Sequence, residues 1–353
     1  MTVIDSDAHI VECDETWSYL DPSDRQYRPV RVAETDANGE PKEYWLIDGN
    51  IFPAGRPGLG QARVGPHTDK VLTPDESKYL TDVSARIRHM DELGTDVQIL
   101  FPTIFINPVT EDPAMERALC KSYNRCLADI WSQSNNRLRW AAVLPLLSMD
   151  VAMEELRTAR MNGACAVIMR GIESENRLII DPYFHRLYAE ASDLDMPICV
   201  HTGNGSTDIM SIFPSGYGFP RFKLIGVGAF QVVCESRLPD QFPNLRWGFI
   251  ELSAQWIPYV IKDLSRRFER RDIQMKENIL RDNHIWVTCQ TNDDLDYIMS
   301  YVGDDNLVIG TDYGHADTST EVYALKNLSE VAGLSQESAR KFLDDNARAL
   351  YGL

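Results

Sequence analysis

The stretch Ile4-Asp5-Ser6-Asp7-Ala8-His9 lies close to the start of the chain, where a short apolar strand is predicted to end. Side chains two positions apart on an extended chain point to the same side. The carboxylate of Asp7 and the imidazole of His9 therefore project together from the end of this strand, where packing alone does not explain them. The pair predicts a functional site if other polar side chains converge on it from distant parts of the sequence.

Composition excludes several classes of partner. The formal net charge of −18 argues against nucleic acid and anionic membrane as partners, although a locally positive site can still bind a small anionic substrate. No apolar run approaches the ~20 residues of a membrane span, and the N-terminus has no signal-type segment. The seven cysteines are scattered without CxxC spacing, which favours reduced, mostly buried side chains in a cytoplasmic protein.

The chain of 353 residues is 44% hydrophobic and has room for a large core. Eight short apolar runs alternate with helix-length segments of 3.6-residue periodicity, as in a (β/α)8 TIM barrel. An open doubly wound α/β sheet is the alternative, but no glycine-rich phosphate turn follows the first run. We therefore expect one α/β barrel domain over residues 1–353. The predicted strands are Val3–Ile4, Val97–Phe101, Trp140–Leu146, Ala164–Met169, Pro197–Val200, Trp247–Ile250, Ile285–Cys289 and Leu307–Ile309.

Two segments interrupt the alternation of strands and helices. An insertion at about residues 40–72 follows the first strand, and its Asp48-Gly49-Asn50 predicts a hairpin turn. A long loop, Gly203–Pro220, follows the fifth strand and is rich in glycine, serine and aromatic residues. Because long insertions after barrel strands lie on the catalytic face, we expect both segments to cover the substrate pocket.

Four polar residues fall at or just after predicted strand ends: Asp7, His9, His201 and Asp312. In a barrel these ends share one face, and the first and eighth strands are neighbours. Two imidazoles and two carboxylates converging there would bind one divalent metal ion, and this mixed nitrogen and oxygen set suits Zn²⁺ or Mn²⁺. Considered singly, His201 could equally be a buried structural histidine, and Asp7 could cap a loop.

A family resemblance is carried by Ile4–Glu12, Pro197–His201, Phe242–Glu251 with Trp256 and Pro258, Gly310–His315 and Asn346–Gly352. In these segments the chain resembles the amidohydrolase-related barrel enzymes that include the aminocarboxymuconate-semialdehyde and resorcylate decarboxylases. Members often begin with His-x-His, whereas this chain has Asp7-Ala8-His9, and Gly314 replaces the proline usual between Tyr313 and His315. The resemblance is specific for the family and weak for the substrate.

The resemblance implies roles for further residues. Glu251 ends the sixth strand and would transfer a proton or hold the substrate, although it could also be a metal ligand or the structural partner of an arginine. His315 would act in acid–base catalysis or orient Asp312, unless His315 is only a structural residue at a helix start. Asp312 is itself a catalytic candidate. Arg170 ends the fourth strand and suits a substrate carboxylate, or a structural ion pair. Glu12 is the acidic neighbour expected to support the ligands.

The resemblance implies a lyase that removes CO₂ non-oxidatively from a small aromatic or cyclic carboxylate. The enzyme alternative is a hydrolase that cleaves a C–N bond or lactone, with Asp312 taking a proton from a metal-bound water. A metal-stabilised binding protein without turnover is the third possibility, against which the surplus of acid–base groups argues. Relatives commonly associate, so a homodimer or higher homo-oligomer is expected.

Overall fold

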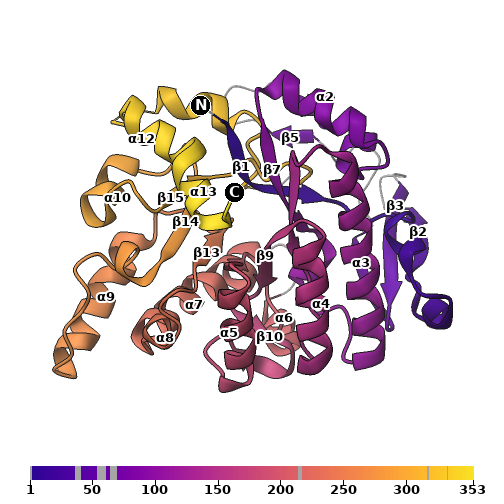
Figure 1. Cartoon of the computed structure of the whole chain (residues 1–353), viewed down its shortest axis with the longest axis horizontal. Helices are drawn as coiled ribbons and strands as arrows, with labels where there is room; N and C mark the ends of the chain where they lie inside the picture. Colours follow the sequence, from indigo (N-terminus) through magenta and orange to yellow (C-terminus); the bar gives the residue numbers. More distant parts are fainter. Residues whose placement is uncertain are drawn as a thin grey trace.

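A computed structural model of the chain describes residues 2–35, 41–53, 61–63, 70–213, 217–315, 318–331 and 333–353. Eight parallel strands form a nearly closed barrel with helices between them, as predicted (Figure 1). In barrel order these are β1 (Ile4–Ile10), β7 (Val97–Pro102), β8 (Leu138–Ala142), β9 (Ala164–Met169), β12 (Ile198–His201), β13 (Trp247–Ile250), β14 (Ile285–Cys289) and β15 (Leu307–Ile309).

Most strands lie where apolar runs predicted them, because strands covered on both faces consist almost wholly of apolar residues. Two differ. β1 continues through Asp7 and His9 to Ile10, so these side chains project from inside a strand rather than beyond its end. β8 begins at Leu138 and ends at Ala142, and the apolar residues after it belong to a loop that is also buried.

The longer helices begin and end near their sequence signals. The helix α3 begins at Pro113, and the side chain of Asp112 caps it by accepting from Ala114 N at 2.8 Å. The helix α2 ends before Gly94, which has the left-handed φ of 73° typical of a C-terminal cap. The longer helices are α2 (Val83–Leu93), α3 (Pro113–Gln133), α4 (Met149–Met161), α5 (His185–Asp193), α7 (Leu224–Glu235), α9 (Ile257–Arg270) and α10 (Leu295–Val302).

The insertion forms a separate antiparallel sheet of β2 (Val30–Thr35), β3 (Pro41–Ile47) and β4 (Asn50–Pro53). Figure 1 shows β2 and β3 at the edge of the molecule, beyond α3. The hairpin turn at Asp48-Gly49 has positive φ at both residues, as its sequence predicted. The sheet starts before residue 40, earlier than predicted. Its first strand, β2, is largely exposed, so it has no buried apolar face that would mark it in the sequence. Two short strands follow, β5 (Gln61–Arg63) and β6 (Lys70–Leu72).

The long loop after β12 contains a short helix, α6 (Thr207–Ile212), and a π-helical turn at Phe219–Lys223. Residues 54–60, 64–69 and 214–216 of the two predicted pocket segments lie outside the described residues, so their covering role stays a prediction. All seven cysteines are buried thiols. Within the described ranges, the helices are too short or too polar to span a bilayer.

The C-terminal helix α13 (Asn346–Tyr351) packs against the barrel and reaches the first strand. The hydroxyl of Tyr351 donates to the carbonyl of Ser6 at 2.7 Å, and a Cβ on Gly248 of β13 would meet Leu350 at 3.4 Å. The first strand and the last helix of the chain are therefore in direct contact.

Candidate metal and active site

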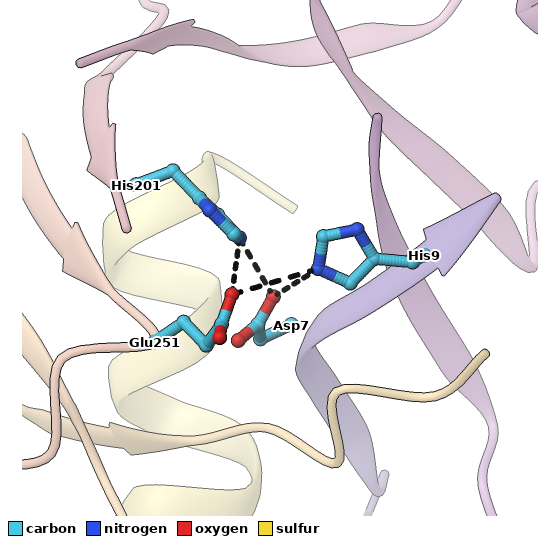
Figure 2. Close-up of side chains that lie close together, drawn as sticks. All are labelled: Asp7, His9, His201 and Glu251. Carbon is cyan, nitrogen blue, oxygen red and sulfur yellow. Dashed lines mark hydrogen bonds and ion pairs between the residues drawn. The ribbon is translucent and has the colours of Figure 1, made fainter. Parts of the chain in front are cut away.

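Four side chains, from β1 and from the ends of β12 and β13, point toward one another (Figure 2). Asp7 and His9 come from β1, His201 is the last residue of β12, and Glu251 directly follows β13. At most 4% of each residue is exposed. The register in which β1 pairs with β7 shifts between Asp5 and Ala8, and such a bulge changes the direction of the side chains that it contains.

The ligand-type atoms of this group lie within one small space. The Nε2 atom of His201 is 3.3 Å from Asp7 Oδ1 and 3.6 Å from Glu251 Oε2. The Nε2 atom of His9 is 3.5 Å from the same Asp7 oxygen and 4.0 Å from the Glu251 oxygen. These four residues form a group whose ligand atoms lie within 4.8 Å of one another, as a metal site requires.

A second group overlaps the first on the side of β15. Asp312 Oδ1 is 3.3 Å from His9 Nε2 and 2.7 Å from His315 Nδ1. The ring of His315 stacks on that of His9 with centroids 3.7 Å apart. His9, Glu251, Asp312 and His315 form this second group. The structure thus brings together all the predicted site residues except Arg170, and it adds Glu251 to the immediate surroundings of both histidines.

Backbone carbonyls fix how the two central histidines are protonated. His9 Nδ1 lies 3.0 Å from the carbonyl of Pro102, and His201 Nδ1 lies 2.9 Å from the carbonyl of Thr202. Because a carbonyl only accepts, both Nδ1 atoms carry a proton, and the neutral tautomer set by this contact presents the Nε2 lone pair to the site. Among the described residues, His9 Nε2 is a buried nitrogen with no hydrogen-bond partner. This arrangement is typical of metal-binding histidines.

Electrostatics also favour a cation. Burial lowers the pKa of His9 to about 3, so its ring is neutral at pH 7. Burial would raise the pKa of Asp7, but the close contacts of its carboxylate with His201 and His9 outweigh burial and hold that pKa well below its usual range. The cluster also holds the carboxyl groups of Glu251 and Asp312, and buried carboxylates require a compensating charge. A divalent cation therefore fits the donor set.

The two groups cannot be filled independently. Both include His9, and an imidazole nitrogen has one lone pair, which can bind one ion. An ion bound by Asp7, His9, His201 and Asp312 would leave His315 beside it, in contact with Asp312 and available for proton transfer.

Unusual backbone geometry aims the carboxylates of Glu251 and Asp312. Their φ angles are 59° and 51°, in the left-handed region that costs a residue with a side chain about 1 kcal/mol or more. Hydrogen bonds hold each turn, from Glu251 N to Thr288 Oγ1 at 2.7 Å and from Asp312 N to the carbonyl of Asp7 at 2.9 Å. The chain bends sharply where each strand ends, at the site.

Glu12 supports the site from outside both groups. Its carboxylate accepts from the backbone N–H groups of Thr103 and Ile104, both at 3.0 Å, and burial raises its pKa to about 7. The hydroxyl of Thr103 in turn lies 2.9 Å from His315 Nε2. Glu12 thus fixes the loop that carries a partner of His315.

Arg170 lies apart from the two groups. Its guanidinium donates through Nε and Nη2 to one oxygen of Glu173, Oε2, and the other oxygen, Oε1, accepts from the Arg170 backbone N–H at 2.6 Å. Met169 pairs with Val200, so Arg170 follows β9 at the level of His201 on the neighbouring strand. Arg170 lines a pocket together with polar and apolar side chains, and no residue of the two ligand-type groups lines it.

Sequence reasoning missed three residues that contact the site. Thr320 donates to Asp312 Oδ2 at 2.6 Å, and nothing in its sequence context indicates this. Thr103 directly follows β7, so its place after a strand end was an available signal. Asp5 precedes Asp7 by two positions, and the same alternation that links Asp7 to His9 extends to it.

Comparison with known proteins places the chain in a family. The family model for amidohydrolases matches residues 81–353. An amidohydrolase from Mycobacterium avium subsp. paratuberculosis K-10 superposes with a TM-score of 0.82 at 19% identity, covering 100% of this chain and 98% of that one.

Two further solved structures show the fold at low identity. One is 5-carboxyvanillate decarboxylase from Novosphingobium aromaticivorans DSM 12444, complexed with manganese and 4-hydroxy-3-methoxy-5-nitrobenzoic acid, with a TM-score of 0.63, 19% identity, and coverage of 80% of this chain and 85% of that one. The other is 4-oxalomesaconate hydratase from Rhodopseudomonas palustris, with a TM-score of 0.65, 16% identity, and coverage of 99% and 96%.

Proposed function

The chain belongs to the amidohydrolase family, and from that premise we propose that it is a metal-dependent decarboxylase of a small aromatic or cyclic carboxylate. The observation that carries the proposal is the buried cluster in which two Nε2-presenting histidines meet Asp7, Glu251 and Asp312. Decarboxylation needs an anchor for the carboxylate and an acid beside the carbon that loses it, and this cluster contains candidates for both. Similarity to decarboxylases such as the manganese-bound example adds support.

Asp7, His9, His201 and Asp312 would hold one divalent ion, either Zn²⁺ or Mn²⁺. When bound, such an ion supplies positive charge that anchors the substrate through its carboxylate and a neighbouring oxygen. The burial of the cluster places it in a low-dielectric environment, which strengthens every charged contact within it. The backbone contacts of His9 and His201 keep their Nε2 atoms directed into the site throughout.

Glu251 is the proposed proton donor. In its protonated form it gives a proton to the ring carbon that bears the carboxylate. The carbon–carbon bond then breaks, its electron pair restores the ring, CO₂ leaves, and Glu251 regains a proton from solvent. His315, held between Asp312 and Thr103, assists by keeping Asp312 in place.

The test combines isotope labelling with one substitution. Wild-type enzyme in D₂O, assayed with a panel of ring carboxylates, should place deuterium on the carbon that lost CO₂. Glu251→Gln keeps the shape but cannot cycle a proton, so turnover should fall by ~10²-fold or more while metal and substrate still bind. Glu190→Gln, at a surface ion pair with Arg157, is the matched control and should keep full turnover. A Glu251→Gln variant as active as this control would remove Glu251 from the mechanism.

Hydrolysis is the second candidate, favoured by the 2.7 Å contact between His315 and Asp312. This pair is suited to accept a proton from a water molecule. Asp312 would take the proton, and His315 would share it through their contact. Lactones and cyclic amides in H₂¹⁸O should then give a product that carries the label. Label in the product without CO₂ release would replace decarboxylation with hydrolysis.

Arg170 is the proposed anchor for a second polar group of the substrate. Its place directly after β9, level with His201 on the neighbouring strand, supports this role, whereas its ion pair with Glu173 means that a substrate would share the guanidinium. Arg170→Gln should therefore raise KM with little change in kcat, as loss of uniform binding does. A loss of stability with unchanged KM would assign Arg170 a structural role.

A further inference from the structure

The barrel closes between β1 and β15 without a regular hydrogen-bonded ladder. The eight-stranded sheet begins with β1 and ends with β15, and one isolated bridge, Ala8 with Tyr313, joins these two edges in the described residues. Backbone bonds from Asp312 N to Asp7 O at 2.9 Å and from His9 N to Tyr313 O at 2.8 Å complete the contact. The residues of this seam are therefore site residues or their neighbours.

The carboxylate of Asp5 fastens the seam from inside. Its Oδ1 accepts from Thr311 N at 2.9 Å and from Asp7 N at 3.3 Å, and its Oδ2 accepts from Thr311 Oγ1 at 2.6 Å. Asp5 is completely buried. One side chain thus binds the residue before Asp312 and the backbone of Asp7, one on each side of the seam.

A buried chain of polar groups holds Asp5 in turn. Gln98 donates to Asp5 Oδ2 at 3.0 Å and accepts from Arg86 Nε at 2.7 Å. Arg86 also donates to the carbonyl of His9 at 3.3 Å, and its guanidinium lies 3.5 Å from the ring centroid of Tyr313. Both ends of this series of hydrogen-bonded side chains therefore contact residues on each side of the same seam.

We propose that Asp5 is a positioning residue that sets the separation of Asp7 and Asp312 and thereby the affinity of the site for a divalent cation. The inference rests on the proposed metal site. Asp5 does not contact the ion: it acts through the Thr311 backbone, which carries Asp312, and through the amide of Asp7. A ligand pair held at the right spacing binds an ion without first paying the free energy of reorganisation.

The test is Mn²⁺ binding to purified, folded protein, measured by competition with a chromogenic chelator and by the spin-resonance spectrum of the bound ion. Asp5→Asn replaces an acceptor oxygen with an amide nitrogen and should raise the Mn²⁺ dissociation constant by about 10- to 100-fold. The matched control is Asp96→Asn. Asp96 also holds β1, by accepting from Val3 N at 2.7 Å, but this contact lies at the start of the strand, away from the site. This control should bind Mn²⁺ as the wild type does, whatever it loses in stability.

Two substitutions at Thr311 keep the proposal testable if Asp5→Asn does not fold. Thr311→Val removes the hydroxyl that Asp5 binds and should weaken Mn²⁺ binding, and Thr311→Ser should restore it. Equal affinities across the Asp5, Thr311 and Asp96 variants would overturn the role of Asp5 while leaving the metal site intact. A wild-type protein that binds no Mn²⁺ would instead overturn the proposed metal site and this inference with it.

Discussion

Substitution of Gly310 by alanine should disturb the site more than its size suggests. A Cβ at this position would lie 2.2 Å from Asp7 Cβ, 2.8 Å from its amide nitrogen and 2.9 Å from its Cα. Carbon atoms in contact lie about 3.5–4.0 Å apart, so Asp7 or β15 must move by roughly 1.5 Å. Because the atoms in the way are backbone and Cβ atoms, no change of rotamer relieves the clash.

The expected cost is about 1–3 kcal/mol of unfolding free energy from overpacking, and ~10²-fold in turnover from a displacement of this size. Urea denaturation and a turnover assay measure the two effects separately, and Mn²⁺ titration measures the metal affinity of the site. Gly228→Ala is the control, since a Cβ there meets no atom within 4 Å and lies in the helix α7. It should gain about 0.5–1 kcal/mol. A Gly310→Ala protein with wild-type stability and Mn²⁺ affinity would refute the close approach of β15 to Asp7.

Three further substitutions test other parts of the structure. His201→Ala should lose most bound metal in elemental analysis while the fold survives, and His185→Ala, outside the cluster, should keep it; full occupancy in the first variant would exclude His201 as a ligand. Burial raises the pKa of Glu116 from 4.5 to about 7, so the folded state binds the carboxyl proton more tightly than the unfolded state does. The unfolding free energy of the protein therefore falls as the pH rises from 4.5 to about 7. Glu116→Gln should remove this slope, worth at most about 3 kcal/mol, in urea titrations at pH 5 and pH 8; parallel pH profiles would contradict it. Trp45→Ala, at a fully buried position, should cost about 3–5 kcal/mol, whereas Ile51→Ala, which is 62% exposed on the same sheet, should be near neutral in thermal melts.

The barrel could be predicted because its strands are buried on both faces. Ala164–Met169, Trp247–Ile250 and Ile285–Cys289 coincide with their apolar runs to the residue. Prediction was weaker where burial and polarity diverge. β1 runs on through buried polar residues, and β2 is exposed along most of its length. The single-domain organisation, the oligomeric state and the cytoplasmic location stay predictions.

For the site, sequence spacing was enough to select residues that the structure places together. Asp7 and His9 lie in the second half of β1, His201 ends β12 and Asp312 comes shortly after β15, and parallel strands of a barrel end on one face. Their role as metal ligands stays a prediction. The pairing of Arg170 with Glu173 could not be read from sequence, because it depends on how the loop after β9 turns. The backbone carbonyls that orient His9 and His201 are likewise invisible in a pattern of side chains.

The seam between β1 and β15 has a consequence for synthesis of the protein on the ribosome. Asp5 and Thr311 are 306 positions apart. At translation rates of ~5–20 residues per second, about 15–60 s separate the emergence of the two halves of the cluster. During that interval the nascent chain carries an aspartate and a histidine without their opposite carboxylate, and closure waits for a contact of very high sequence separation. A cation held at the wild-type affinity would then report that translation has passed Asp312 and that the barrel has closed.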